Sequence, residues 1–188
     1  GAVVTGAPFT VTAVIWQEAG VTSGVPTVIS DGQYVAVSNW WPGFTLRYQA
    51  GNDRLTAVMG ASNAPYATLN QSDWRDGHEG RWVDVAFSHD GAAARLFVGG
   101  REAASATNAF SAFRQAELRI GGGHVNLADA FWKGRIDDVR IYRTALGTGE
   151  LVRVNEWLGD ADGDGLINGE EYRAGADPWT ADTDGDGL

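Results

Sequence analysis

Residues 9–16 read FTVTAVIW, and this stretch decides the fold class. Phe9, Val11, Ala13 and Ile15 occupy every second position, and the intervening side chains belong to the other face. A period of two is the pattern of a β-strand with one face against an apolar core. The stretch therefore predicts a strand in a packed sheet.

Short runs of the same kind recur along the chain. Turn signals such as Asp90-Gly91 and Gly121-Gly122-Gly123 separate them. Many short strands at this spacing are typical of an antiparallel sandwich or jelly roll and not of a βαβ fold. Further strands are expected at residues 27–30, 33–39, 44–49, 54–59, 82–88, 94–99, 116–121 and 134–142.

The last of these runs is irregular. Ile136 and Val139 are three residues apart, so they cannot share a face with Ile141 in a straight strand. A β-bulge at Asp137-Asp138 restores the alternation. After this strand the apolar spacing becomes helical, which predicts a helix that begins with Thr148 as its N-cap and ends at Gly159.

Net charge is concentrated at the C-terminus. Residues from Asp160 onward carry eight of the ten net negative charges, and the preceding part is nearly neutral. Nucleic acid and anionic membrane are therefore disfavoured as partners, whereas divalent cations are favoured. No apolar run approaches the roughly 20 residues that cross a bilayer, so membrane insertion is not expected.

The sequence DADGDGLINGEE, residues 160–171, fits the calcium-loop pattern D-x-D-x-D-G-x5-E. Three carboxylates at alternating positions converge on one hard cation, the glycine permits the sharp turn, and the closing glutamate binds through both oxygens. The alternative is a solvated acidic linker. The expected calcium ligands are Asp160, Asp162, Asp164, the carbonyl of Leu166, Asn168 through water, and Glu171.

A second copy of the loop begins 22 residues later and supplies Asp182, Asp184 and Asp186 before the sequence ends at Leu188. It lacks the closing glutamate, so weak binding or none is expected. The stretch DADGDGLINGEEYRAGADPWTADTDGDGL resembles the thrombospondin type 3-like calcium repeats of secreted bacterial proteins. Dockerin modules have a similar repeat length, so cohesin binding stays as an alternative. In the repeat interpretation, folding of the loop depends on its metal.

Most of the preceding chain resembles the laminin G-like, concanavalin A-like jelly-roll domains. The resemblance is carried by FTVTAVIW, RWVDVAFSHDG, ARLFVGG, LRIGGG and, above all, GRIDDVRIYRTALGTGEL at residues 134–151. This resemblance implies an all-β antiparallel jelly-roll domain over residues 1–147. Together with the calcium-repeat resemblance, it leaves residues 148–188 as a short connecting helix and an EF-hand-like calcium loop of the thrombospondin type 3-like repeat. Such domains bind glycans, mediate adhesion or act as spacers, so the fold alone does not select a function.

No catalytic motif is evident. The sequence contains neither G-x-S-x-G nor H-E-x-x-H, and it lacks the Glu-x-Asp-x-x-Glu run of the hydrolase relatives. The three histidines are isolated from one another. The chain is therefore expected to be non-catalytic.

The tryptophans suggest a ligand. Some of the eight lie in polar or loop-like segments, where an exposed indole beside Arg, Asp or His would suit a sugar. The alternative is that these rings cover loops or a neighbouring domain. The expected ligand-binding residues are Trp40, Trp41, Trp74, Arg75, His78, His124 and Trp132, whereas Trp16 and Trp82 are expected in the core.

Taken together, these features predict a secreted, non-catalytic carbohydrate-binding module, cut from a larger bacterial extracellular protein and followed by a calcium-stabilised linker. Its partners would be a polysaccharide or glycan and other domains of the same chain. The competing interpretation is an adhesion or spacer domain whose partner is a protein.

Overall fold

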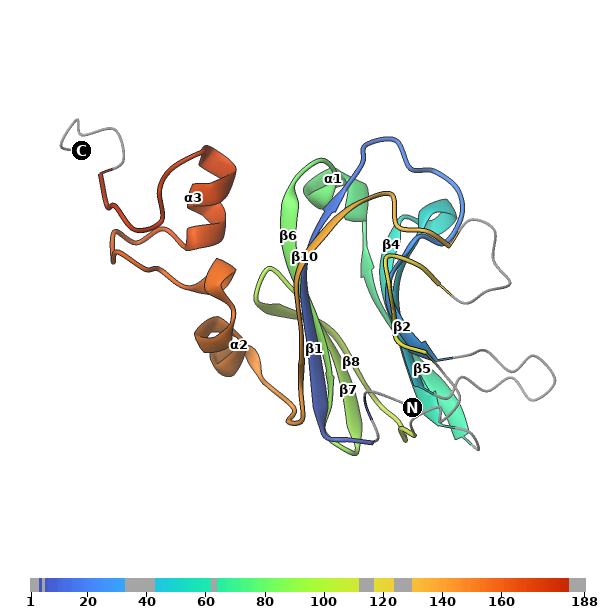
Figure 1. The fold of residues 1–188 in the computed structure, drawn as a ribbon. Helices are drawn as coiled ribbons and strands as arrows, with labels where there is room; N and C mark the ends of the chain where they lie inside the picture. The colour runs from blue at the N-terminus through green and yellow to red at the C-terminus, as the bar shows by residue number, and fades with distance from the viewer. Residues whose placement is uncertain are drawn as a thin grey trace.

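The computed structural model describes residue 4 and residues 6–32, 43–61, 64–111, 117–123 and 130–182. Two antiparallel five-stranded sheets pack face to face as a jelly-roll sandwich (Figure 1). One sheet has the order β10-β1-β6-β7-β8 and is called sheet A here; the other has the order β5-β4-β3-β2-β9 and is called sheet B. The predicted all-β jelly-roll class is confirmed.

The strands of sheet A are β1 (Phe9–Gln17), β6 (Trp82–His89), β7 (Ala93–Val98), β8 (Arg101–Thr107) and β10 (Gly134–Tyr142). Those of sheet B are β2 (Thr27–Gly32), β3 (Gly43–Gln49), β4 (Arg54–Ala61), β5 (Ala64–Ser72) and β9 (Arg119–Ile120). The helical elements are η1 (Ala50–Asn52), α1 (Trp74–His78), α2 (Thr148–Val154), η2 (Glu156–Leu158) and α3 (Asn168–Ala174).

The alternating apolar residues of β1 face the core, as predicted. Phe9, Val11, Ala13 and Ile15 belong to the core between the sheets, where Phe9 and Phe44 of the opposite sheet stack with ring centroids 5.6 Å apart. The predicted bulge is also present, because the pairing of β1 with β10 shifts between Thr12 and Val14. Asp138, at the bulge, adopts a φ of 45°.

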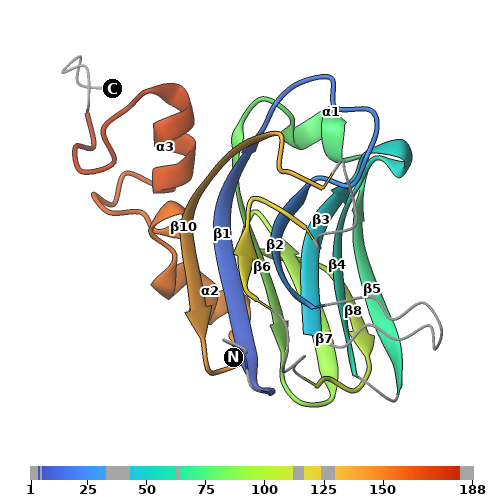
Figure 2. The same ribbon diagram turned by 45° about the vertical axis from the view of Figure 1, so that its right-hand side comes forward.

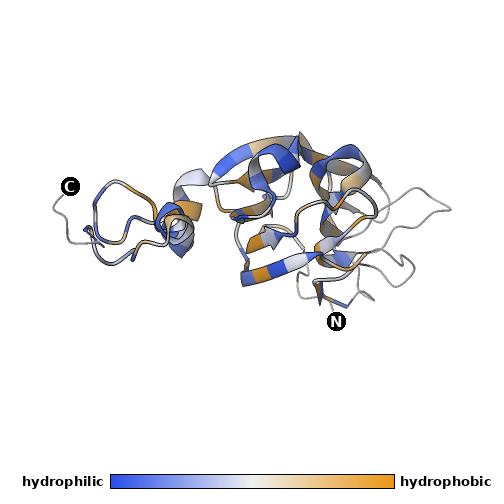
Figure 3. Ribbon diagram, turned by 90° about the horizontal axis from the view of Figure 1, so that it is seen from above, coloured by the Kyte–Doolittle hydropathy of each residue, from blue (hydrophilic) through white to orange (hydrophobic). Residues whose placement is uncertain are grey.

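A second, smaller core lies on the outward face of sheet A. Its buried members are Ala86, Phe97, Leu146, Leu151 and Leu158, and it is called the outer cluster here. It is covered by the C-terminal appendage, defined as residues 148–182, which lies beside β10 and β1 (Figures 1 and 2). Seen from above, the appendage packs against one side of the sandwich (Figure 3).

The predicted helix is divided. Thr148 is the first residue of α2, and Gly147 precedes it as the N-cap, with its backbone N–H donating to Glu150 Oε2 at 2.9 Å. Asn155 then has extended backbone, and its Oδ1 accepts the N–H of Trp157 at 3.1 Å, which starts η2. The helical segment ends before Gly159, as predicted.

Candidate functional site

The acidic loop between η2 and α3 gathers its carboxylates. One oxygen from each of Asp160, Asp162 and Asp164 lies within 4.8 Å of the others. Asp160 accepts the N–H groups of Gly163 at 2.7 Å and Gly165 at 3.1 Å, which wraps the backbone around the carboxylates. Gly165 has a φ of 98°, a conformation that favours glycine, so the predicted sharp turn is confirmed.

Glu171 closes the loop from α3. Its side chain is only 1% exposed, and its Oε2 atom has no hydrogen-bond partner; Asp162 Oδ2 lacks one too. Burial, followed by the nearby charges of Asp162, Asp164 and Asp160, raises the pKa of the Glu171 carboxyl. A buried carboxylate beside three others is costly unless a cation neutralises it. The donor set, all oxygen, fits calcium.

The other residues of the acidic loop either hold the loop in shape or are candidate calcium ligands. Asn168 is 2% exposed and its Oδ1 accepts the N–H of Ala161 at 2.9 Å, so this side chain ties the two ends of the loop together. Leu166 is exposed, and Ile167 packs against the outer cluster, as expected for the apolar anchor of the loop. Asp182 begins the second loop, whereas Asp184 and Asp186 lie outside the described residues.

The predicted exposure of Trp74 is wrong, whereas Arg75 and His78 are partly exposed and their assignment stays a prediction. Trp74 is fully buried in the core, where its Nε1 donates to Gln17 Oε1 at 2.9 Å and its ring stacks on His78 at 4.3 Å. Arg75 Nε lies 3.1 Å from Asp53 Oδ1, which also accepts the hydroxyl of Tyr48 at 2.8 Å. The polar neighbours of Trp74 therefore hold its helix over the core and leave no ring surface for a ligand.

Trp132 is also misassigned as an accessible ring. It is 9% exposed, and its Nε1 donates to the carbonyls of Trp16 and Arg135, each at 3.2 Å. Trp16 and Trp82, expected in the core, are instead half-buried on the outward face of sheet A. Trp40, Trp41 and His124 lie outside the described residues, and their assignment stays a prediction.

Another face carries polar side chains that the sequence did not single out. Phe44, Leu46 and Tyr48 of β3 point into the core, so Thr45 and Arg47 belong to the outward face of sheet B. The pairing register extends this face across the sheet. One row is Arg119, Ser30, Thr45, Val58 and Thr68, and the next row is Thr27, Arg47, Thr56 and Asn70.

The outward face of sheet B is pre-organised by hydrogen bonds. The hydroxyls of Ser30 and Thr45 lie 3.0 Å apart, and Thr56 donates to Asn70 Oδ1 at 2.9 Å. Ser30, Thr45 and Thr56 are nevertheless almost fully buried, so the accessible groups lie toward the edge strand β5. These are Arg47, Tyr66, Thr68 and Asn70.

Electrostatics distinguish Arg47 within this face. The side chain is half-buried, and desolvation lowers the pKa of its guanidinium, an effect that nearby Tyr66 opposes. A partly desolvated guanidinium gains more from a hydrogen-bonded ligand than a fully hydrated one. Arg47 on the central strand β3 and Tyr66 on the edge strand β5 together offer a donor and an aromatic ring on this face.

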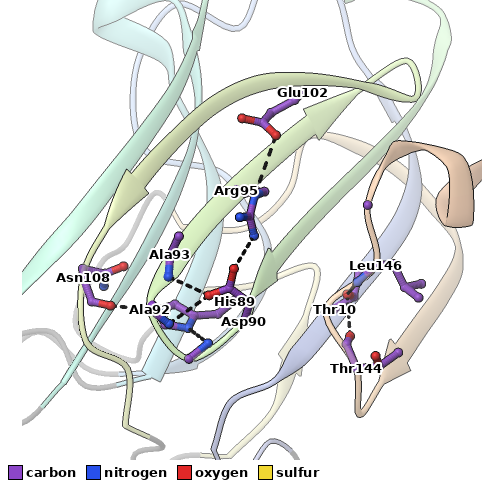
Figure 4. A network of polar contacts seen from close by, with 12 residues as sticks. Thr10, His89, Asp90, Ala92, Ala93, Arg95, Glu102, Asn108, Thr144 and Leu146 are labelled. Carbon is purple, nitrogen blue, oxygen red and sulfur yellow. Dashed lines mark hydrogen bonds and ion pairs between the residues drawn. The ribbon is translucent and has the colours of Figure 1, made fainter.

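The two histidines in the described part of the chain serve the fold. His89 is buried, accepts the N–H of Gly91 at Nδ1 and approaches the Asn108 carbonyl with Nε2 at 3.2 Å (Figure 4). Burial lowers the pKa of its imidazole, so the neutral form is favoured. His78 Nδ1 lies 3.1 Å from the carbonyl of Trp74. Neither arrangement is that of a nucleophile and its base.

Comparison with known proteins agrees with this architecture. Residues 2–152 match a laminin G-like family described as the concanavalin A-like lectin/glucanases superfamily. The chain belongs to this superfamily. No curated protein matches it. The match stops within α2, so η2, the acidic loop and α3 lie beyond the family domain.

Several similar solved structures are of proteins that act on or bind sugars. Domain 4 of AbnA, an extracellular arabinanase from Geobacillus stearothermophilus in complex with arabinotriose, is 26% identical with a TM-score of 0.58; the match covers 80% of this chain and 67% of that one. A sialidase CBM40 from Ruminococcus gnavus bound to α2,3-sialyllactose is 17% identical with a TM-score of 0.60, covering 80% and 83%. A putative carbohydrate binding protein from Bacteroides ovatus is 18% identical with a TM-score of 0.61, covering 89% and 46%.

Proposed function

We propose that this domain is a non-catalytic carbohydrate-binding module whose glycan lies on the outward face of sheet B. The observation that carries the proposal is the ordered set of hydroxyl, amide and guanidinium groups on that face. Arg47 and Asn70 flank Thr56 across three adjacent strands, and Tyr66 lies on β5, the strand that carries Asn70. Such convergent polar groups beside an aromatic ring suit the hydroxyls and the apolar face of a sugar.

The similar structures support the same substrate class. The arabinanase domain and the sialidase module are both in complex with oligosaccharides, and both share the sandwich. The competing role is adhesion to a protein or spacing between domains. The described residues of this face include no comparable set of groups that favours it. A protein partner would instead be expected to use apolar or aromatic anchors.

The proposal is tested by screening the protein on immobilised polysaccharides and measuring the affinity for a hit by calorimetry. Arg47→Gln is expected to weaken binding by about tenfold, because it removes charge-assisted hydrogen bonds. Arg101→Gln is the matched control, since Arg101 is exposed on β8 of the other sheet. Glycan binding that is absent, or unaffected by Arg47→Gln and by Asn70→Ala, contradicts the proposal.

The acidic loop is proposed to hold one calcium ion through Asp160, Asp162, Asp164, the Leu166 carbonyl and Glu171. The buried, unpartnered Oε2 of Glu171 supports this assignment. When bound, the ion would offset the repulsion among the four carboxylates and hold the loop closed. The chain's own residues prepare this state, because glycine N–H groups already orient Asp160 and Asn168 already joins the loop ends.

Titration calorimetry with calcium chloride tests the metal site. Glu171→Gln is expected to abolish saturable uptake at millimolar calcium and to remove the effect of a chelator on the melting temperature. Glu170→Gln, the neighbouring exposed position, should behave as the wild type. Equal uptake by the two variants would refute the assignment.

We also propose that the parent protein is extracellular. The arabinanase whose domain 4 is similar is described as extracellular, and the proposed calcium loop is of a kind that resembles secreted repeats. Among the described residues, no helix has the length and apolar character needed to span a bilayer. Detection of the parent protein in culture medium or on the cell surface tests this location.

A further inference from the structure

A groove of about 560 Å³ separates the outward face of sheet A from the appendage. Trp82 and residues of β10 line one wall, and Glu156, Trp157 and Tyr172 line the other. The second wall lies beyond the region that matches the superfamily. The groove is therefore a composite feature, formed because the appendage docks on the sandwich.

Aromatic rings form a continuous row in this groove. The centroids of Trp82 and Trp157 are 6.1 Å apart, and those of Trp157 and Tyr172 are 5.1 Å apart. Tyr172 is 41% exposed, and both tryptophans are partly exposed. The row thus offers apolar ring surface to a ligand, in contrast to the buried rings of Trp74 and Trp132.

The opposite wall supplies oriented polar groups. Because of the bulge in β10, the consecutive residues Asp137 and Asp138 both line the groove. Arg140 Nε contacts Asp138 Oδ1 at 2.6 Å, and its Nη1 donates to the Val154 carbonyl at 2.8 Å. These bonds fix the guanidinium and one carboxylate, while Asp137 is exposed.

The mixture of charges restricts the ligand class. The Arg140 guanidinium is paired with Asp138, so Asp137 and Glu156 leave the groove with a net negative charge that opposes an anion. An uncharged polyol can use donors and acceptors of both signs, and its C–H face can stack on the aromatic row. We propose that this groove is a second binding site, for a neutral oligosaccharide; this inference rests on the proposed function and extends it to a separate face.

The test is calorimetric titration of the full chain, in calcium chloride, with the neutral trisaccharides of arabinose, xylose, glucose and galactose. Tyr172→Ala and Asp137→Asn are each expected to weaken binding of one of these by about tenfold. Asn retains an acceptor for the Asp138 N–H, so this variant should fold normally. Trp179→Ala is the control, since Trp179 is 67% exposed on the appendage and does not line the groove.

The outcomes separate this proposal from the first one. Weakening by Tyr172→Ala and Asp137→Asn, with an unchanged melting temperature and no effect of Trp179→Ala, supports the groove. Binding that responds to Arg47→Gln but not to the groove variants overturns the groove and leaves the sheet B site. Binding that responds only to the groove variants supports the groove and overturns the sheet B site. Binding of none of the trisaccharides overturns the groove proposal.

Discussion

Single residues explain how the sheet A side of the molecule is held together. Thr10 is fully buried, donates its hydroxyl to the Thr144 carbonyl at 2.7 Å and accepts the N–H of Leu146 at 2.8 Å (Figure 4). Thr10→Val leaves both backbone groups without a partner, so a loss of about 1–3 kcal/mol in the free energy of unfolding is expected. Urea denaturation measures it, with Thr107→Val on the exposed strand β8 as control. Equal losses in the two variants would contradict this account.

Asp90 makes stability depend on pH in the acid range. Its carboxylate accepts the N–H groups of Ala92 and Ala93 at 2.9 and 2.8 Å and contacts Arg95 Nη1 at 2.8 Å (Figure 4). The hydrogen bond from the Ala92 backbone N–H, followed by the one from the Arg95 side chain, lowers the pKa of Asp90. A lowered pKa adds stability above the unfolded value of about 4, and this stability is lost as the pH falls further.

Asp90→Asn should therefore cost stability at pH 7, and the difference from the wild type should shrink as the pH falls below about 4. Urea unfolding of both proteins between pH 7 and pH 2.5 measures the difference. A difference that stays constant, or grows, over this interval would show that the ionised carboxylate is not what stabilises the turn.

At the residue scale, local sequence predicts the gathering of the carboxylates in the acidic loop better than it predicts the exposure of the tryptophans. The calcium loop is local, because one short segment supplies its carboxylates, its turn glycine and its apolar anchor Ile167. Whether a tryptophan is exposed depends on residues that are distant in the sequence. Trp74 stands among polar residues, yet Asp53 from a distant turn and Gln17 from β1 hold it in the core. Strand pairing brings Arg47 and Asn70 to the same face of sheet B, and the apolar alternation of the sequence does not specify which strands pair.

Among elements, the strands with a clear apolar alternation are predicted and those without it are missed. β5 and β8 are absent from the expected strands, because APYATLNQS and REAASAT are rich in small and polar residues. Both are edge strands of their sheets. An edge strand pairs with one neighbouring strand only and buries little apolar surface. Residues 33–39, expected as a strand, lie outside the described residues.

The joint between sandwich and appendage depends on a glycine in the turn between β7 and β8. Gly100 has a φ of 68°, and a Cβ there would lie 3.0 Å from Leu158 Cδ2, whereas Gly99 has a φ of 58° with open space around it. Both alanine variants should cost about 1–2 kcal/mol of backbone strain. Gly100→Ala should lose more, by roughly 1 kcal/mol, because Leu158 must shift in the outer cluster. Thermal or urea unfolding compares the pair, and identical losses would mean that this contact is not tight.

On the scale of the whole molecule, the appendage is a docked element. Leu151 and Leu158 are buried in the outer cluster, and Trp157 contacts Trp82 of the sandwich on one side and Tyr172 on the other. The sequence predicts a calcium-stabilised linker in this part of the chain. The structure shows instead that its first part shares a core with the jelly roll. The proposed calcium ion would therefore bind in an appendage whose first part already packs against the sandwich.

The central claim is that sheet B presents a glycan-binding face, and amide chemical-shift mapping tests it most directly. A uniformly ¹⁵N-labelled sample is titrated with the saccharide chosen by the polysaccharide screen. The account predicts that the largest shifts occur at Arg47, Tyr66, Thr68 and Asn70 and that Arg47→Gln reduces the other shifts in parallel with the affinity. Saturable binding that leaves all of these amides unshifted would contradict it.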